Sequence, residues 1–385
     1  MSQRVLISAG EASGDLYAAH LVSALRARNP ESVFFGCTGP RMRAQGVETI
    51  VDAHQLAVVG LVEVVRHIPS IYRQYRRLLR AATERRPALA ILVDSPDFHL
   101  RLARRLRRLN IPVLYFVAPQ VWAWRRGRIH SLRRDIDRLL CIFPFEEEFF
   151  RQQGIAAEYI GHPLTTMVRP LASRRDFRRQ LGIGLDQPTV ALMPGSRLGE
   201  AVRHLPILLD CVMLLRRQLS AAAVIGLPAG LLERLPANFR ERITALSIQV
   251  VEGRSWDVLA HSDVALAASG TVTVEAALLG TPMVTFYRVS RLSWLLGRRF
   301  VKVPYLTMVN LLANRKIVAE LMQEEMTPER LASEASRLLL DSEARERMGH
   351  DLAEVRRLLE TEKEPLDRAA EIAQQMLGAP ACLAA

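Results

Sequence analysis

The sequence predicts an α/β protein built from two doubly wound units, in which helices cover both faces of a mainly parallel sheet. Short apolar runs alternate with helical patterns along most of the chain, which is the order of elements that gives a parallel sheet. The series also occurs twice, and an arginine-rich stretch broken by Pro170 separates the two occurrences. A chain of 385 residues is long enough to form two cores of ordinary size.

The first series begins at residues 4–9, an apolar run that ends at Gly10 and precedes a helical pattern over residues 16–27. Four further runs are typical of buried strands, because they are short, apolar and bounded by polar or helical stretches. They are SVFFGCTG (32–39), PALAILVDS (87–95), IPVLYFVAP (111–119) and RLLCIFPF (138–145).

The second series consists of TVALMPGS (189–196), AAAVIGLP (221–228), IQVVEG (248–253), DVALAASG (263–270) and TPMVTFY (281–287). We therefore expect a first domain over residues 1–165, a second over 166–345, and a helical tail over 346–385. The tail is expected to pack back on the first domain or on a partner subunit. Because open α/β sheets bind ligands beyond the carboxyl ends of their strands, we expect the chemistry in the cleft between the two domains.

Composition limits the class of protein. No apolar run approaches the roughly 20 residues of a membrane span, and the first residues lead into a strand rather than a signal peptide, so a cytoplasmic protein is expected. The four cysteines have neither disulfide nor zinc-ligand spacing. The net charge of +12 favours an anionic partner such as nucleic acid, anionic lipid or phosphate, and charge alone does not choose among them.

The loop GEASGD (10–15) joins the first strand to its helix, and its glycines let a ligand approach the backbone. Glu11, Ser13 and Asp15 are therefore candidates for an acceptor-side loop. The loop is not a dinucleotide fingerprint, because no acidic residue follows the second strand at the required distance. An alternative interpretation is a capped turn, with Ser13 or Asp15 as the helix N-cap.

Asp94 directly follows the strand ALAILV, where a parallel strand delivers side chains to the ligand-binding edge. A carboxylate there can remove a proton from an acceptor hydroxyl. Asp97 is an alternative base, or it caps the helix that follows. Trp122 and Trp124 precede Arg125 at the end of the next strand, where aromatic faces can stack on sugars and arginines can hold phosphates. Packing in a core edge is the alternative for these tryptophans.

Two loops of the second domain predict a diphosphate site, because each ends a strand and opens a helix, whose N-terminal N–H groups attract anions. The residues are Gly195, Ser196 and Arg197 in the first loop, and Ser269, Gly270 and Thr271 in the second. Glu275 follows in the same helix and can accept the ribose hydroxyls of a nucleotide or interact with the helix dipole. Histidines and carboxylates are not clustered, so no bound metal is expected.

The apolar run over residues 56–65 is too short to span a membrane, and a basic helical pattern from Tyr72 to Arg80 follows it. An apolar patch rimmed by cations fits interfacial binding to anionic lipid, although many such runs belong to a core. The candidates for membrane or acyl-chain contact are Val58, Val59, Leu61, Val62 and Val65.

Taken together, these motifs resemble those of the lipid-A-disaccharide synthase family, glycosyltransferase family 19 of Gram-negative bacteria. The matching blocks are GEASGD (10–15), TGPRM (38–42), LAVVGLVEV (56–64), DSPDF (94–98), APQVWAWR (118–125), PFE (144–146), GHP (161–163), PGSR (194–197), ASGTVTVE (268–275) and NLLANR (310–315). They span nearly the whole chain in order, which makes the set far more specific than any single glycine loop.

The resemblance implies a GT-B fold and an inverting transfer that uses no metal or other cofactor, with UDP as the leaving group. The implied donor is UDP-2,3-diacylglucosamine and the implied acceptor is 2,3-diacylglucosamine 1-phosphate. Their β-1,6 linkage gives lipid A disaccharide 1-phosphate for lipopolysaccharide biosynthesis. The resemblance assigns the base to Asp94 and matches Arg197, Glu275 and Asn310 to positions implicated in UDP binding or activity. One departure is His99, where asparagine is frequent in the family.

These inferences predict a peripheral enzyme on the cytoplasmic face of the inner membrane, with anionic phospholipid as a partner and no nucleic acid. A homodimer that exchanges C-terminal segments is a further implication of the resemblance. Two alternative hypotheses assign the chain to a different class of protein. Another GT-B enzyme, such as an epimerase acting on a UDP-N-acetylhexosamine, shares the scaffold. A non-enzymatic basic protein on membrane or RNA explains the charge and leaves the strand-end motifs unexplained.

Overall fold

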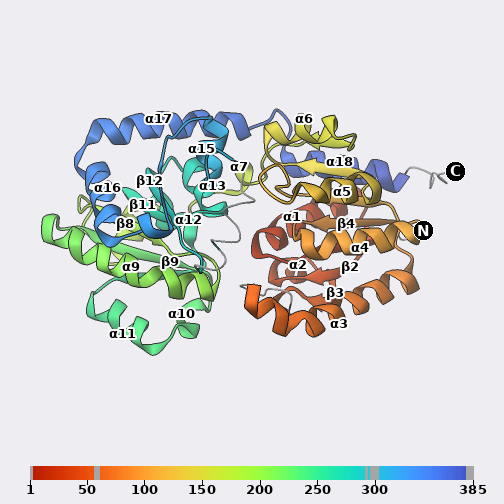
Figure 1. Cartoon of the computed structure of the whole chain (residues 1–385), viewed down its shortest axis with the longest axis horizontal. Helices are drawn as coiled ribbons and strands as arrows, with labels where there is room; N and C mark the ends of the chain where they lie inside the picture. The colour runs from red at the N-terminus through yellow and green to blue at the C-terminus, as the bar shows by residue number, and fades with distance from the viewer. Residues whose placement is uncertain (1–2, 56–60, 291–293, 295–302, 379–385) are drawn as a thin grey trace. The chain divides into compact units, whose positions relative to one another are not determined.

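The computed structural model describes residues 3–55, 61–290, 294 and 303–378. The chain divides into two compact units. Unit 1 contains the residues up to Thr166 together with those from Leu359 onward, and unit 2 runs from Met167 to Leu358. Each unit is built on its own parallel sheet with helices on both faces (Figure 1). The predicted α/β class with two doubly wound units is therefore confirmed.

Unit 1 contains a seven-stranded parallel sheet in the order β3-β2-β1-β4-β5-β6-β7. The strands are β1 (Arg4–Ala9), β2 (Val33–Thr38), β3 (Glu48–Asp52), β4 (Leu89–Val93), β5 (Val113–Phe116), β6 (Arg138–Cys141) and β7 (Ala157–Tyr159). Five of them lie within the predicted apolar runs. The two edge strands, β3 and β7, were not predicted, because an edge strand is covered less and its sequence lacks a continuous apolar run.

The helices of unit 1 follow its strands in alternation. They are α1 (Ala12–Arg28), α2 (Pro40–Ala44), α3 (Leu61–Arg85), α4 (Pro96–Arg108), α5 (Ile129–Asp135), α6 (Pro144–Gln152) and α18 (Pro365–Gly378), with 3₁₀ turns η1 (Ala53–Gln55) and η2 (Arg126–Arg128). The helix α18 packs against α1, and Asp367 pairs with Arg28 at 2.8 Å. The last helix of the chain is thus part of the first unit.

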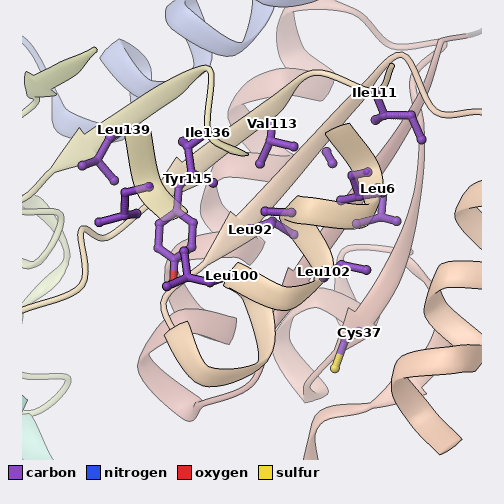
Figure 2. Packing of buried hydrophobic residues seen from close by; sticks show 14 of the residues in the cluster. Leu6, Cys37, Leu92, Leu100, Leu102, Ile111, Val113, Tyr115, Ile136 and Leu139 are labelled. Carbon is purple, nitrogen blue, oxygen red and sulfur yellow. The ribbon is translucent and has the colours of Figure 1, made fainter. Parts of the chain in front are cut away.

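Apolar side chains between the sheet and the helices α3 and α4 form a continuous core in unit 1. Figure 2 shows the ring of Tyr115 beside Leu100 of α4, with Leu92 of β4 in the same layer. Burying each such side chain contributes about 1.5–3 kcal/mol relative to leaving it exposed, so this layer stabilises unit 1. The phenol oxygen of Tyr115 is its one polar atom, and its partner lies in the loop that follows β4.

Unit 2 contains a six-stranded parallel sheet in the order β10-β9-β8-β11-β12-β13. The strands are β8 (Thr189–Met193), β9 (Ala222–Leu227), β10 (Gln249–Glu252), β11 (Val264–Ala268), β12 (Met283–Tyr287) and β13 (Ala319–Met322). The described helical segments are α8 (Arg174–Gln180), α9 (Leu198–Gln218), α10 (Leu231–Arg234), α11 (Ala237–Ala245), α12 (Ser255–Ala260), α13 (Thr271–Leu278), α15 (Met308–Ala313), η3 (Gln323–Glu325), α16 (Pro328–Leu340) and α17 (Ser342–Leu359). The short helix α7 (Leu164–Met167) precedes them, where the chain passes from unit 1 to unit 2.

The strand order of each sheet reverses direction at one point. In unit 1 this switch point lies between β1 and β4, and in unit 2 it lies between β8 and β11. Loops at the carboxyl ends of such strands diverge and leave a crevice in which ligands of this class of sheet bind. Among the helices in the described ranges, none is long and apolar enough to cross a membrane.

Candidate functional site

The switch point of unit 1 brings together the loops that follow β1 and β4. The two strands pair in parallel up to Ala9 and Val93. A Cβ atom on Gly10 would lie 2.5 Å from Oγ and 3.2 Å from Cβ of Ser95, so the glycine lets the first loop approach the second closely. The motifs GEASGD and DSPDF, which start 84 residues apart in the sequence, therefore share one edge of the sheet.

Asp94 occupies this edge in an unusual backbone conformation. Asp94 and Ser95 have φ angles of 52° and 48°, in the left-handed region that non-glycine residues adopt rarely. The amide of Asp94 donates to the carbonyl oxygen of Phe116 at 3.0 Å. Its own carbonyl oxygen lies 2.6 Å from the Tyr115 hydroxyl and 2.6 Å from Nδ1 of His99. Three hydrogen bonds thus hold the Asp94 peptide in place, and its side chain is half-buried.

His99 is buried beneath this loop, and burial lowers its pKa to about 4, so the ring is neutral at pH 7. A carbonyl oxygen can only accept, so Nδ1 carries the single ring proton and donates to Asp94. The other nitrogen, Nε2, then accepts from the Ser8 hydroxyl at 2.8 Å. The imidazole links β1 to the loop after β4. It supports the position of Asp94.

The acidic and hydroxyl residues of the GEASGD loop have different environments. Glu11 is exposed at the start of α1, and Ser13 is half-buried in its first turn. Asp15 is buried, and its carboxylate accepts from the backbone N–H groups of Gly39, Arg41 and Met42 at 2.9–3.2 Å. Asp15 therefore caps α2, a helix that starts 25 residues further on. Its carboxylate supports the loop, whereas Glu11 lies on the surface.

Asp97 lies one turn beyond Asp94 and points to the surface, where Arg125 and Arg128 pair with its carboxylate. Trp124 completes the group, because both guanidinium groups lie over its ring. The first tryptophan of the block is different. Trp122 is buried, and its Nε1 donates to Glu146 at 3.0 Å. Trp122 is therefore buried beside this edge of the sheet, whereas Trp124 lies on the surface.

Glu146 was not singled out by the sequence patterns, although it lies within the PFE block. It is fully buried at the start of α6, and burial raises the pKa of its carboxyl group to about 8. Its second carboxyl oxygen accepts from the backbone N–H of Phe143 at 3.2 Å. Glu146 thus joins the loop after β6 to the tryptophan loop after β5.

The switch point of unit 2 brings together the two predicted diphosphate loops. The strands β8 and β11 pair in parallel up to Met193 and Ala267, so their loops leave the same edge. Gly195 has a φ of 116°, and a Cβ atom there would lie 2.6 Å from a carboxyl oxygen of Glu200. The helices α9 and α13 begin after these loops, so two sets of N-terminal N–H groups meet at the edge.

The side chains around these helix starts are mostly accessible. Ser196, Arg197, Gly270 and Thr271 are exposed, whereas Gly195, Ser269 and Glu275 are half-buried. His204, in the second turn of α9, lies 2.7 Å from the carbonyl oxygen of Pro194 and 3.2 Å from the backbone N of Arg288. His204 thereby connects the loop after β8 with the chain after β12. Sequence reasoning assigned it no role, because a single histidine in a helix carries no pattern.

Asn310 is buried, and all the hydrogen-bonding positions of its amide are occupied. Its oxygen accepts from the N–H groups of Ile317 and Val318 at 2.8 and 3.0 Å. Its nitrogen donates to the carbonyl oxygen of Val318 at 3.0 Å and to Glu320 at 2.8 Å. Glu320 also accepts from Thr307 at the start of α15. Asn310 therefore holds α15 and β13 together, and a contact with UDP would require breaking one of these bonds.

The side chains of the five predicted membrane-contact residues lie outside the described part of the chain. Val58 and Val59 lie outside the described residues, and Leu61, Val62 and Val65 fall in the first turns of α3, where the side chains are also outside the described set. Across the described residues, no three His, Cys, Asp or Glu side chains are grouped so that they could hold a metal ion. A metal-independent reaction remains a prediction.

Two doubly wound units, each with loops at the switch point of its sheet, define the class of GT-B glycosyltransferases and related enzymes. The solved structure of the calicheamicin glycosyltransferase matches 98% of this chain and 98% of its own with a TM-score of 0.58 and 18% identity. The UDP-GlcNAc 2-epimerase from Neisseria meningitidis matches 98% of this chain and 99% of its own, with a TM-score of 0.61 and 12% identity. The predicted GT-B fold is confirmed, and the fold alone does not separate a transferase from an epimerase.

The sequence separates them. The family model described as lipid-A-disaccharide synthetase matches residues 5–376. A lipid-A-disaccharide synthase from Solibacter usitatus (strain Ellin6076) is 57% identical over 374 residues, which cover 97% of both chains. The chain belongs to the lipid-A-disaccharide synthetase family. It is a hexosyltransferase of lipid A biosynthesis that joins lipid-linked sugars, and the epimerase and non-enzymatic alternatives are set aside.

Proposed function

We propose that unit 1 binds the acceptor and supplies the base, and that unit 2 binds the donor. The acceptor is 2,3-diacylglucosamine 1-phosphate and the donor is UDP-2,3-diacylglucosamine. The observation that carries the proposal is the Asp94 peptide, which Tyr115, His99 and Phe116 hold at the switch point of unit 1. A base must be fixed in direction before it can accept a proton efficiently, and three hydrogen bonds around one peptide provide that rigidity.

The reaction proceeds in one displacement. The Asp94 carboxylate takes the proton of the acceptor 6-hydroxyl as the oxygen attacks C1 of the donor glucosamine from the face opposite UDP. The bond between C1 and the diphosphate oxygen breaks, UDP leaves with the electron pair, and inversion at C1 gives the β-1,6 linkage. General base catalysis of this kind contributes about 10²–10⁴ in rate.

The leaving group needs positive charge where its negative charge develops. In unit 2 the exposed Arg197 and the starts of α9 and α13 lie at one edge, which supports diphosphate binding there. Glu275 lies in the second turn of α13 and is proposed to accept the ribose hydroxyls. For Asn310 we prefer an indirect role, because its amide already makes four hydrogen bonds. It orders the segment behind the donor site.

The test is turnover of Asp94→Asn in buffer that contains EDTA, with disaccharide detected by mass spectrometry and UDP binding measured by calorimetry. We expect turnover to fall by about 10²–10⁴-fold while UDP affinity stays within a factor of about two, because only the proton acceptor is lost. Asp97→Asn is assayed in parallel. Normal turnover in Asp94→Asn, with loss in Asp97→Asn, would assign the base to Asp97 and contradict the proposal.

We also propose that the enzyme docks on anionic phospholipid at the cytoplasmic face of the inner membrane. The neighbouring helices α3 and α4 support this, because Tyr75 donates to the carbonyl oxygen of Arg101 and both helices carry exposed arginines. This arginine face comprises Arg73, Arg76 and Arg77 of α3 and Arg101, Arg104 and Arg105 of α4. Each basic residue near an anionic membrane contributes about 1 kcal/mol, so six are enough for reversible attachment.

Co-sedimentation with phosphatidylcholine vesicles, with and without phosphatidylglycerol, tests the membrane proposal. The enzyme is expected to sediment with the anionic vesicles and to be released by salt. Replacing Arg73, Arg76 and Arg77 by Gln should reduce binding strongly. The control replaces Arg217, Arg234 and Arg240, which are exposed on unit 2, and it should retain binding. Equal loss in the two triple variants would show that net charge, and not the arginine face, attracts the lipid.

A further inference from the structure

We propose that Arg125 and Arg128 bind the 1-phosphate of the acceptor, and that the Asp97 carboxylate occupies them when no acceptor is present. The inference rests on the proposed function, because it requires unit 1 to bind a phosphorylated sugar beside Asp94. It adds a ligand, a phosphate monoester, to a cluster of side chains that the base mechanism does not use.

The first observation is how the two arginines meet the Asp97 carboxylate. One nitrogen of Arg125, Nη1, lies 2.8 and 3.1 Å from the two carboxyl oxygens, and Arg128 contacts the first of them. The Asp97 side chain is 69% exposed and that of Arg128 is 15% exposed. The anion therefore lies on the solvent side and the second arginine lies beneath it. An ion pair with a solvent-exposed carboxylate is weak, so a stronger anion can replace this carboxylate.

The second observation is the charge of the cluster. Arg125, Arg126 and Arg128 stand within four positions of one another, and Asp97 neutralises a single charge. A phosphate monoester carries about −1.5 to −2 at pH 7, which matches two guanidinium groups better than one carboxylate does. Guanidinium groups also present paired N–H donors in a plane, the geometry that phosphate oxygens accept best.

The third observation is that the arginines are held in advance of binding. The guanidinium carbons of Arg125 and Arg128 lie 4.5 and 5.5 Å from the centroid of the Trp124 ring. Stacking on an aromatic ring fixes the plane of a guanidinium group. Arg125 also has a left-handed φ of 55°, a conformation that a non-glycine residue keeps only where its surroundings impose it. Less entropy is then lost when an anion binds.

The arginine cluster lies at the same edge of the unit 1 sheet as the proposed base, Asp94. The hydroxyl of Tyr115 donates to the Asp94 carbonyl oxygen at 2.6 Å. Asp97 lies three residues after Asp94 in the first turn of α4, and Arg125 and Arg128 pair with its carboxylate, so the cluster lies at the same end of β4 as the base. The acceptor carries its 6-hydroxyl and its 1-phosphate on one sugar ring. An anion site beside the base would therefore orient the ring with its hydroxyl toward Asp94.

The experiment compares two acceptors, 2,3-diacylglucosamine 1-phosphate and the same lipid without the phosphate, in Arg125→Ala and Arg128→Lys. We expect kcat/KM for the phosphorylated acceptor to fall by about 10- to 100-fold, the effect of losing a charged hydrogen bond, with little change for the other acceptor. The KM for the donor should not change. Asp97→Asn, which frees the arginines, should lower the KM for the phosphorylated acceptor.

Arg107→Ala is the matched control, because its side chain is 45% exposed, as is that of Arg125, and it also pairs with an aspartate, Asp137. It should keep the wild-type preference for the phosphorylated acceptor. Equal losses on both acceptors in the Arg125 and Arg128 variants would mean a purely structural ion pair. A raised KM for the donor would mean that the arginines bind its diphosphate. Both results overturn the inference.

Two further outcomes separate this inference from the proposed function. Weaker binding of Arg125→Ala to phosphatidylglycerol vesicles without acceptor, equal to that of the arginine-face triple variant, would assign the arginines to lipid headgroups and overturn the inference. Absence of disaccharide with the wild-type enzyme and both substrates would instead overturn the proposed function. An active wild-type enzyme that uses both acceptors equally well would leave the base assignment intact and reject the phosphate site.

Discussion

The Nδ1 atom of His99 lies 2.6 Å from the carbonyl oxygen of Asp94, and the Tyr115 hydroxyl lies 2.6 Å from the same oxygen. One carbonyl group therefore accepts two side-chain hydrogen bonds, one from α4 and one from β5. Because Asp94 and Ser95 both have left-handed φ angles, the loop needs such support to persist. The donors act through the backbone, so they position the base without touching a substrate.

Tyr115→Phe removes one of these donors and keeps the packing of the ring. We expect kcat to fall by roughly tenfold with little change in KM, because a small displacement of the base weakens the transition state more than the ground state. Stability should fall by about 0.5–1.5 kcal/mol. Tyr75→Phe is the control, since the Tyr75 hydroxyl also donates to a carbonyl oxygen, that of Arg101 at 3.3 Å, away from Asp94. An equal loss of kcat in the control would contradict the positioning role.

His99 should make stability depend on pH in a defined window. Its pKa is lowered to about 4 in the folded protein, against about 6.5 when unfolded, so between these values the unfolded chain binds the additional proton. The contribution of the neutral His99 ring to the free energy of unfolding is complete above pH 6.5 and is lost as the pH falls toward 4. Between pH 7 and pH 5 we expect a loss of about 2 kcal/mol that His99→Asn does not show.

Urea denaturation of the wild type and of His99→Asn at pH 7, 6 and 5 measures this difference. Asparagine keeps a side-chain donor that can reach a nearby carbonyl group, so the variant should fold. His162, whose pKa burial lowers to about 3, is present in both proteins and cancels in the comparison. Parallel curves of stability against pH for the two proteins would show that His99 is charged, or exposed, in the folded state.

The sequence was sufficient for the strands that are covered on both faces and for the loops that follow them. Asp94, Gly195 and Ser269 lie at strand ends, as the apolar runs predicted, because a buried parallel strand is a continuous apolar segment. The edge strand β13 escaped prediction, since Leu321 is the one buried residue of AELM and the other three are half-buried.

The partners of side chains were much less predictable. Asp15 suggested a cap for its own helix, yet its carboxylate accepts from the start of α2. Tyr115 lies in a buried apolar strand, and nothing local shows that its hydroxyl reaches a loop 21 residues earlier in the chain. Such contacts depend on how strands and helices are placed in space. A pattern along the chain records which side chains are buried and leaves the identity of their polar partners open.

Glu146 should make the stability of the protein change with pH in the direction opposite to His99. Burial raises the pKa of its carboxyl group to about 8, whereas an unfolded glutamate ionises near 4.5, so the folded state holds the additional proton between these values. Stability from this group is present below pH 4.5 and is lost as the pH rises toward 8. Glu146→Gln cannot ionise, so it should gain stability relative to the wild type between pH 6 and pH 9. Urea denaturation at these two pH values measures the gain.

The contact between Glu146 and Trp122 gives this titration an optical signal. The Trp122 Nε1 donates to Glu146 at 3.0 Å, so ionisation of the carboxyl group changes the field at the indole. The fluorescence of the wild type should titrate with a midpoint near pH 8, and the transition should vanish in Glu146→Gln and in Trp122→Phe. A transition that persists in both variants would come from another group and would contradict the assignment.

Asn310→Ala distinguishes support of the donor site from direct binding of UDP. The substitution leaves the N–H groups of Ile317 and Val318 and the carbonyl of Val318 without their partner, which should destabilise unit 2 by about 2–4 kcal/mol. Hydrogen exchange should show lost protection at residues 317–318, and UDP affinity should fall with it. Asn310→Asp places a carboxyl oxygen where Nδ2 now donates to the Val318 carbonyl and to Glu320, so it should lose that protection as well. Lost UDP affinity with unchanged exchange in Asn310→Ala would mean that the amide contacts UDP directly.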